Sequence, residues 1–391
     1  MSDTLRLQWV QSVAEVPQPA WDALAQPLAT PFFEWTWLHH LEDSGSAVAR
    51  AGWQACHLVA WRGTELVAAA PLYLKGHSYG EFVFDQQWAE LAQRLGLNYY
   101  PKLLGMAPMT PAVGYRFLFA PAEDEADLTA ALLAEIDRFC SRNDILSCNF
   151  LYVDPAWKPL AEAAGYSAWM HHNSVWSNQG FDSFDDYLGM FNANQRRNIR
   201  REVKSMETAE LRLEARTGDE IPHDWFGRMY RFYSDHCDRF GWWGSKYLTR
   251  DFFERLAHDY RHRVLLVAAF GTDAHHPQAM SFCIHKGDRL YGRYWGSDQE
   301  VDNLHFNCCY YKPIEWAIAH GIRSFDPGAG GSHKKRRGFP ATAHWSLHRW
   351  YEPRFGAILR PWLAQVNELE AEEIEAINGE LPFRRPEVPL G

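Results

Sequence analysis

The stretch YGRYWGSDQEVDNLHFNCCYYKPIEWAIAHGIRSFDPGAGGSHKKRRGF, residues 291–339, decides the fold of the chain. YGRYWG predicts a strand end, because its aromatic residues stand between glycines that let a ligand or another backbone approach closely. The following aromatic-rich segment predicts a helix that ends at Gly321, with either a kink at Pro313 or a late start near residue 312. IRSFDPG then predicts a second strand. Strand, helix and strand in this order indicate an α/β fold.

A similar order of elements occurs earlier in the chain. A strand–turn–strand pattern at 57–74 has a counterpart at 263–285, and each is followed by a helix and another strand. The residue-level similarity is weak, but the order is compatible with a duplicated α/β unit. We expect an N-terminal unit over 1–165, a C-terminal unit with the main motifs over 166–365, and an acidic terminal helix and tail over 366–391.

Helical spacing of apolar residues predicts further helices over 88–97, 125–143 and 224–240. The segment FDSFDDYLGMFNANQRRNIRREVKSME, which begins at Phe181, also reads as helical, with basic residues repeating at every fourth position on one face. We expect the last residues, PFRRPEVPLG, to form a frayed tail.

Composition excludes several classes of protein. With 47% hydrophobic and 15% aromatic residues among 391, the chain can bury a large core, which excludes disorder as its main state. No run of 18 apolar residues occurs, so no membrane-spanning helix is expected. The start, MSDTLRLQWV, lacks the basic and apolar regions of a signal peptide, and the seven Cys contain no CxxC pair. These features predict a cytoplasmic protein with reduced thiols.

The net charge is −10, but two short windows of the sequence are basic. Residues 194–204, NQRRNIRREVK, hold five basic residues and one acidic residue, and residues 333–337, HKKRR, hold four basic residues and none acidic. The remaining 30 basic and 48 acidic residues give −18. Compact basic sites on an acidic body favour a defined anion such as a phosphate over DNA or another large polyanion. Solvated helix ends are the alternative for each window.

The second window follows a strand and a glycine-rich turn, SFDPGAGGSHKKRRGF (324–339). Closely spaced glycines permit positive φ and expose backbone N–H groups to an anion. The cations that follow would neutralise a phosphate or carboxylate. The spacing fits neither a P-loop nor a GxGxxG fingerprint, and a flexible basic loop is the alternative.

The helix after YGRYWG has candidate catalytic side chains near its N-terminal end, where anions bind readily. His305 and Tyr310 have the chemistry of a general base and a general acid. A His on an aromatic helix is also compatible with a satisfied core residue. Metal-ligand spacing and a GxSxG elbow are both absent from the sequence, so we expect neither a metal site nor covalent catalysis.

At this point the sequence resembles a known family. HHNSVWSNQGFDSFDDYL, QRRNIRRE, YGRYWG, LHFNCCYYKPIEWAIAHG and GAGGSHKKRRGF look like the ordered motifs of the FemAB-like predicted N-acyltransferases of bacteria, and the similarity spans roughly residues 20–365. The resemblance implies tandem GNAT-type (acyl-CoA N-acyltransferase) folds. This sequence departs from the family pattern in one region. The family pattern has Glu at the positions of Asn307, Asp326 and Ser332, and Gln at the position of Gly330. The site is therefore more basic here, which indicates a divergent subgroup.

The resemblance implies direct N-acyl transfer from an activated donor, with no permanently bound cofactor. The donor would be acyl-CoA or an acyl-carrier thioester, and the acceptor an amine, including a long-chain amine of bacterial sphingolipid or ceramide synthesis. The first alternative is a Fem-type transferase that uses aminoacyl-tRNA and a peptidoglycan precursor, and the second is a non-catalytic GNAT-like binding protein. The aromatic richness and the narrow basic windows favour an acyl chain and a small phosphate over tRNA.

We assign candidate roles on residue type and this resemblance. His305 or Asp326 would deprotonate the amine, and Tyr310 or Tyr294 would protonate the leaving group. The donor's phosphates would be bound by the following residues: Gly328, Gly330, Gly331, His333, Lys334, Arg336, Arg337, Arg197, Arg200 and Arg201. The basic helix would complete this pocket or dock an acyl-carrier protein. Peripheral contact with the inner membrane would need an exposed aromatic patch.

Overall fold

The computed structural model describes residues 4–241, 244 and 246–384, which form two compact units. Unit 1 comprises Met1–His171, Tyr247–Phe252 and Ala343–Ala371. Unit 2 comprises His172–Lys246, Phe253–Thr342 and Glu372–Gly391. The expected boundary at 165/166 lies close to the first change of unit, after His171. The expected C-terminal unit over 166–365 also included Tyr247–Phe252 and part of Ala343–Ala371, which belong to unit 1. Sequence order could not show this, because Leu347–Trp350 of β16 pair with the distant residues 147–150.

Unit 1 contains an antiparallel sheet of order β1-β3-β4-β7, formed by Leu5–Val10, His57–Arg62, Glu65–Ala70 and Leu118–Phe119. A second sheet has the order β2-β5-β6-β8-β16-β9, with strands Trp53–Ala55, Tyr73–Lys75, Lys102–Gly105, Ser147–Phe150, Ala341–Trp350 and Ser167–Ser174. Strands β9 and β16 have residues in both units. The helices of unit 1 are α1 (Gln18–Ala25), α2 (Trp35–Asp43), α3 (Gln86–Arg94), α4 (Glu125–Arg142) and α5 (Lys158–Ala163).

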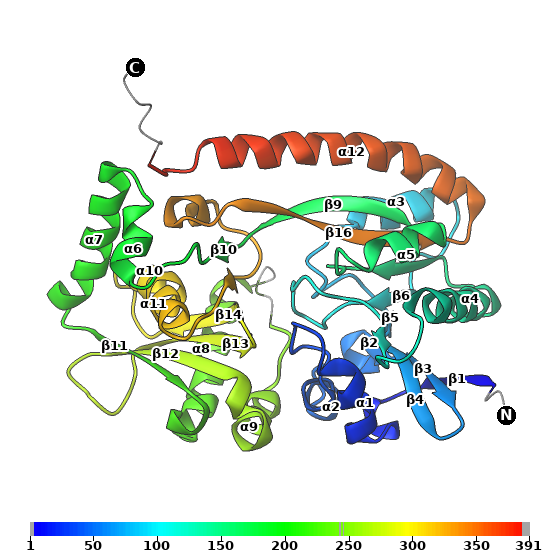
Figure 1. Ribbon diagram of the computed structural model, residues 1–391, viewed down its shortest axis with the longest axis horizontal. Helices are drawn as coiled ribbons and strands as arrows, with labels where there is room; N and C mark the ends of the chain where they lie inside the picture. Colours follow the sequence, from blue (N-terminus) through cyan, green and yellow to red (C-terminus); the bar gives the residue numbers. More distant parts are fainter. Residues whose placement is uncertain (1–3, 242–243, 245, 385–391) are drawn as a thin grey trace. The chain divides into compact units, whose positions relative to one another are not determined.

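Unit 2 is built on one sheet of order β10-β15-β14-β13-β12-β11 (Figure 1). Its strands are Trp176–Ser177, Ser324–Asp326, Arg289–Ser297, Ala279–Lys286, Val264–Phe270 and Arg212–Thr217. Strands β14 and β15 are parallel, and the helical segment between them makes the crossover that parallel strands require. The strand–helix–strand reading of residues 291–326 therefore matches the structure.

The other helices of unit 2 are α6 (Phe184–Gly189), α7 (Ala193–Thr208) and α8 (Asp224–Arg239), while α9 (Arg250–Asp259) has residues in both units. The expected single helix over 181–207 is divided between α6 and α7, because Asn192 caps the start of α7 by accepting a hydrogen bond from the Gln195 amide. Helix α12 (Pro353–Gly379) contains most of the acidic terminal segment. Of the expected frayed tail, Phe383 packs against Phe191, and residues 385–391 lie outside the described residues.

The crossover helix starts early and passes Pro313 without a break. It runs through α10 (Leu304–Phe306), a π-helical turn (Asn307–Tyr311) and α11 (Lys312–Ala319), so it does not begin near residue 312. Proline has no N–H group to donate to the carbonyl one turn earlier in the helix. The wider π turn ends at Tyr311, two residues before Pro313. The Ser281 hydroxyl donates to the Cys308 carbonyl at 2.6 Å, which satisfies one acceptor of this turn.

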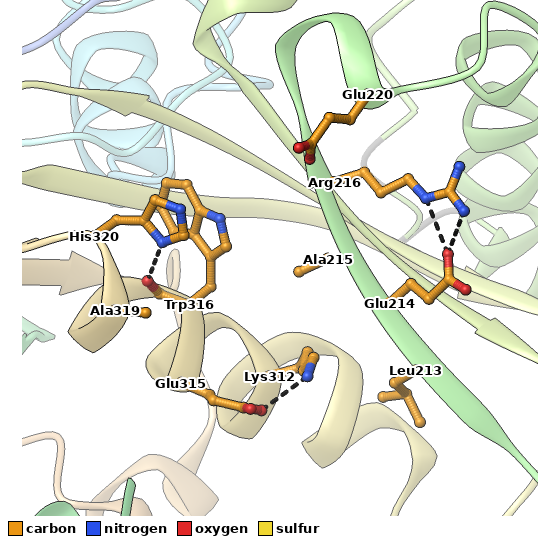
Figure 2. Close-up of a pocket in the computed structure, with 10 residues that line it drawn as sticks. All are labelled: Leu213, Glu214, Ala215, Arg216, Glu220, Lys312, Glu315, Trp316, Ala319 and His320. Atoms are coloured by element: carbon orange, nitrogen blue, oxygen red, sulfur yellow. Dashed lines mark hydrogen bonds and ion pairs between the residues drawn. The ribbon is translucent and has the colours of Figure 1, made fainter. Parts of the chain in front are cut away.

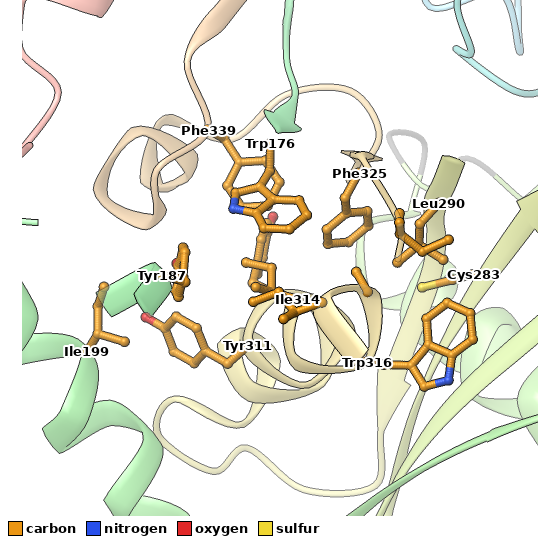
Figure 3. Packing of buried hydrophobic residues seen from close by; sticks show 14 of the residues in the cluster. Trp176, Tyr187, Ile199, Cys283, Leu290, Tyr311, Ile314, Trp316, Phe325 and Phe339 are labelled. Carbon is orange, nitrogen blue, oxygen red and sulfur yellow. The ribbon is translucent and has the colours of Figure 1, made fainter. Parts of the chain in front are cut away.

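Helix α11 lies in the aromatic core of unit 2 (Figure 3). Ile314 and Tyr311 pack against Trp176, Phe325 and Phe339, all of them buried. This burial holds the helix against the strand that leads into the glycine-rich loop, so the core fixes where the loop begins.

Candidate active site

The glycine-rich loop follows β15 directly. Gly328, Gly330 and Gly331 have φ angles of +90°, +71° and +94°, a region that residues with a side chain rarely adopt. The basic residues Ser332–Arg337 then form a short 3₁₀ helix. The glycine cluster therefore makes the sharp turn that the sequence predicts, and the cations follow it on an ordered element.

Asp326 is buried at the start of this loop and is fully engaged. Its carboxylate pairs with the Arg293 guanidinium at 3.0 Å and accepts hydrogen bonds from the Gly328 amide at 2.9 Å and the Asn173 side chain at 3.2 Å. Arg293 reaches it from a β-bulge in β14, where the register with β13 shifts by one residue. Because three donors already occupy its carboxylate oxygens, Asp326 fits a positioning role better than direct contact with an amine.

Arg337 anchors the other end of the loop. Its guanidinium is buried, lies 2.7 Å from the Glu202 carboxylate of α7 and stacks 3.3 Å from the Phe306 ring centroid. The Tyr311 hydroxyl donates to the same carboxylate. With its charge paired and its face covered, Arg337 holds the loop in place instead of reaching a donor's phosphate.

Lys334 is also turned inward. It is buried, and its ammonium donates to the Gly328 carbonyl across the loop. Burial lowers the pKa of Lys334 to about 8, although Asp326 opposes the shift. Lys334 thus closes the loop on itself and leaves Lys335 and Arg336 as its outward cations; Arg336 is exposed, and Lys335 is half-buried and pairs with Glu380.

His305, Tyr310 and His333 come together beside the loop. The Tyr310 hydroxyl lies 2.8 Å from His333 Nε2, and the His305 ring centroid lies 5.6 Å from those of both Tyr310 and His333. Burial, aided by nearby positive charges, lowers the pKa values of His305 and His333 to about 4. Both imidazoles are therefore neutral at neutral pH, the form in which a His accepts a proton.

Tyr294 does not join this group. It lies opposite Phe282 on β13 and packs against Tyr233 and Phe253 of the helices on one face of the sheet. Trp295, the next residue, contacts His305. Because successive strand residues point to opposite faces, Tyr294 faces away from His305 and Tyr310.

The loop lines a cavity of about 390 Å³ within unit 2. Gly330, Gly331, Ser332 and Lys335 of the loop contribute to its lining. The other lining residues are His172, Asn173, Ser174, Glu373 and Ile377. Positive-φ glycines and the Ser332 hydroxyl suit an anionic group of modest size, whereas the Lys335 ammonium pairs with Glu380. Asn173 connects this cavity to Asp326.

The two basic windows meet in the structure. Gln195, in the first turn of α7, donates to the Arg336 carbonyl at 2.7 Å, and Glu202 binds Arg337. The exposed cations of the helix that the sequence singled out are Arg197, Arg200 and Arg201. Arg200 pairs with Asp185 at 3.2 Å, so the basic surface is bounded by an acidic side chain.

Sequence reasoning missed the residues that hold the site together. Glu202 was counted only as the lone acid of a basic window, and Arg293 only as part of YGRYWG. Asn307 donates to the carbonyls of Glu202 and Asn303, both at 3.0 Å, which an ionised Glu at this position could not do. This pair of bonds gives a structural reason for the departure from the family pattern.

A larger hollow of unit 2, about 660 Å³, lies between β11 and α11 (Figure 2). Four of its charged side chains form pairs, Glu214 with Arg216 at 2.9 Å and Lys312 with Glu315 at 2.9 Å. His320 stacks on Trp316 with ring centroids 4.2 Å apart. None of the candidate residues lines it, so we place the site at the smaller cavity.

Two absences apply to the described part of the chain. It contains no group of three or more His, Cys, Asp or Glu side chains arranged to hold a metal ion. None of its helices has the length and apolar character needed to cross a bilayer.

Comparison with known proteins gives the family. A model of the FemAB-like family, described as peptidoglycan biosynthesis/recognition, matches residues 12–385, so the chain belongs to this family. No curated protein matches the sequence.

Solved structures agree on the fold. FemX is similar over 90% of this chain and all of its own, with 11% identity and a TM-score of 0.54. L-PGS from Bacillus licheniformis is similar over 93% of this chain and 99% of its own, with 8% identity and a TM-score of 0.54. A tandem GNAT protein of clavulanic acid biosynthesis covers 89% of this chain at a TM-score of 0.45, with 12% identity. The predicted family is confirmed by the family model, and the similarity to FemX and L-PGS confirms the α/β fold.

The contrast between Arg337 and Arg336 is testable. Arg337→Met leaves the Glu202 carboxylate, 18% exposed, without its cation and removes a buried side chain, so we expect the free energy of unfolding to fall by about 3 kcal/mol. Arg336→Met removes an exposed side chain and should change it by less than about 0.5 kcal/mol. Urea denaturation followed by tryptophan fluorescence measures both. Equal effects of the two variants would contradict the anchoring role of Arg337.

Proposed function

We propose that the protein is an N-acyltransferase that moves an acyl group from acyl-CoA or an acyl-carrier thioester to an amine. The cavity beside the glycine-rich loop supports this proposal most strongly. It has backbone and cationic groups suited to a phosphate, and it adjoins a loop whose residue His333 is bonded to Tyr310. A long-chain amine of sphingolipid or ceramide synthesis is the acceptor class we favour, and a cytoplasmic location with peripheral contact at the inner membrane would suit it.

The proposed reaction needs one proton transfer from the amine to the leaving thiolate. The amine nitrogen attacks the thioester carbonyl, the C–N bond forms and the C–S bond breaks. His305 accepts the amine proton, because its imidazole is neutral, and Tyr310 donates a proton to the sulfur. His333, hydrogen-bonded to the Tyr310 hydroxyl and beside the His305 ring, would pass the proton held by His305 back to the Tyr310 oxygen, so that both side chains return to their starting states.

The proposed donor site uses fewer cations than the sequence suggested. Gly330, Gly331, Ser332 and Lys335 line the cavity, and Arg336 is exposed beside them, whereas Lys334 and Arg337 hold the loop. Arg197, Arg200 and Arg201 would dock an acyl-carrier protein, whose acidic surface they complement. This narrow basic surface favours a small donor or carrier over tRNA.

Donor and acceptor are tested together. We incubate the protein with acyl-CoA, acyl-carrier thioester or aminoacyl-tRNA, pair each donor with long-chain amines or a peptidoglycan precursor, and follow products by mass spectrometry. An amide formed from a thioester and an amine supports the proposal. Product only from aminoacyl-tRNA supports the Fem-type alternative, and thermal stabilisation by donors without any product supports a binding protein.

Tyr310 and Tyr294 provide a matched pair of variants. Tyr310→Phe removes the proposed acid, so we expect kcat to fall by about 10²-fold. Tyr294→Phe removes the same hydroxyl on the opposite sheet face and should leave kcat within about twofold. Steady-state assays with a short soluble amine measure both constants. A larger loss from Tyr294→Phe would refute the assignment.

The pH dependence follows from the buried imidazoles. A base with a pKa of about 4 stays unprotonated at higher pH, so activity should decline only as the pH approaches 4. We expect kcat/KM to show no step between about pH 5.5 and 7.5 from protonation of the base. An inflection near the ordinary His pKa of about 6.5, absent from His305→Ala, would show that His305 titrates normally and that the burial argument is wrong.

A further inference from the structure

Unit 1 contains a loop that the proposed chemistry does not use. Residues 76–85, GHSYGEFVFD, join β5 to α3, and we call them the aromatic loop. Both acidic residues of this loop are turned inward and buried. Glu81 lies 2.7 Å from the Lys102 ammonium, and Asp85 contacts the same ammonium and accepts a hydrogen bond from Tyr99 at 2.6 Å.

The lysines at the base of the loop explain why these acids are buried. Lys75 and Lys102 stand directly opposite each other on the antiparallel strands β5 and β6, where two like charges repel. Lys75 lies over the Trp53 ring at 3.6 Å and donates to the Tyr79 carbonyl at 3.2 Å. These two lysines and the two carboxylates of Glu81 and Asp85 balance in formal charge. Both carboxylates of the loop therefore lie in this inner cluster, and neither is on the outer face.

The backbone of the loop is held in a strained form. Phe82 of the loop has a φ of +56°, and two residues outside the loop, Met109 and Tyr152, have φ of +56° and +54°. The Tyr152 hydroxyl donates to the Phe82 carbonyl at 3.0 Å, and a Cβ at Gly80 would lie 3.5 Å from Met109. Such conformations persist only where the surroundings impose them, so the loop has a fixed shape.

The outer face of this fixed loop is aromatic and uncharged. The Tyr79 and Phe84 side chains are 68% and 76% exposed. Burial and Lys75 lower the pKa of His77 below its usual range, so its ring is neutral at neutral pH. Exposed aromatic side chains do not add to the stability of the fold. On a rigid loop, however, they lose less conformational entropy when they bind a partner.

We propose that the aromatic loop seats the protein at the interface of a neutral, zwitterionic lipid bilayer. Phe and Tyr suit this boundary, where ring faces meet acyl chains and the hydroxyl meets headgroups. The outer face offers no cation for an anionic headgroup, and the net charge of −10 disfavours an anionic surface. The inference rests on the peripheral membrane contact proposed above, but not on the acyl-transfer chemistry.

Vesicle co-sedimentation tests the proposal. We expect the full chain to bind phosphatidylcholine vesicles, and Tyr79→Ser/Phe84→Ser to weaken partitioning by about tenfold or more, as expected for loss of two partly inserted rings. The matched control is Leu369→Ser, which removes another exposed apolar side chain of unit 1, 63% exposed, and should leave partitioning unchanged. Salt should have little effect, because no ion pair with the lipid is involved.

Three results would overturn the proposal: no binding of the wild-type chain to phosphatidylcholine vesicles, equal binding by the double variant, or binding that requires phosphatidylglycerol. An unchanged melting temperature verifies that the double variant is folded, since both side chains lie outside the core. Turnover of a short soluble amine is measured in parallel. Loss of vesicle binding with intact turnover separates this surface from the proposed catalytic site.

Discussion

The ion pair between Glu202 and the buried Arg337 is the interaction on which the candidate site depends. It joins α7 to the end of the glycine-rich loop, while Asp326 and Arg293 hold the beginning. Both pairs lie largely out of water, where an unpaired charge costs several kcal/mol. The loop is therefore fixed at its two ends, and only the segment between them faces the cavity.

This arrangement changes the meaning of the basic windows. The cations predicted to bind a donor divide into two groups. Lys334 and Arg337 stabilise the loop, whereas Lys335 and Arg336 remain on its outer side. A count of charges along a sequence cannot separate these groups, because burial and pairing depend on residues that are distant in the chain.

Local signals predicted much of the fold. The helix expected over 125–143 is observed at Glu125–Arg142, and the one over 224–240 at Asp224–Arg239, because periodicity and capping are local. Non-local features were missed: the bulge that delivers Arg293, the partner of Arg337, and the sheet face on which Tyr294 lies. The bulge and the sheet face depend on strand register, which the sequence of one strand does not specify. The partner of Arg337 depends on how α7 packs beside the glycine-rich loop. The aromatic loop escaped notice for the same reason, since Lys75 and Lys102 become neighbours only when β5 and β6 pair.

Hydrogen–deuterium exchange of the backbone amides of residues 328–338, with and without saturating acyl-CoA, tests most directly whether the loop is preformed. The Gly328 amide is bonded to the Asp326 carboxylate and the Gly338 amide to the Lys335 carbonyl, so we predict slow exchange at these positions before any donor binds. The donor should add protection at Gly330, Gly331 and Ser332, which line the cavity. Exchange of the whole free loop at the rate of an unfolded peptide would contradict the account.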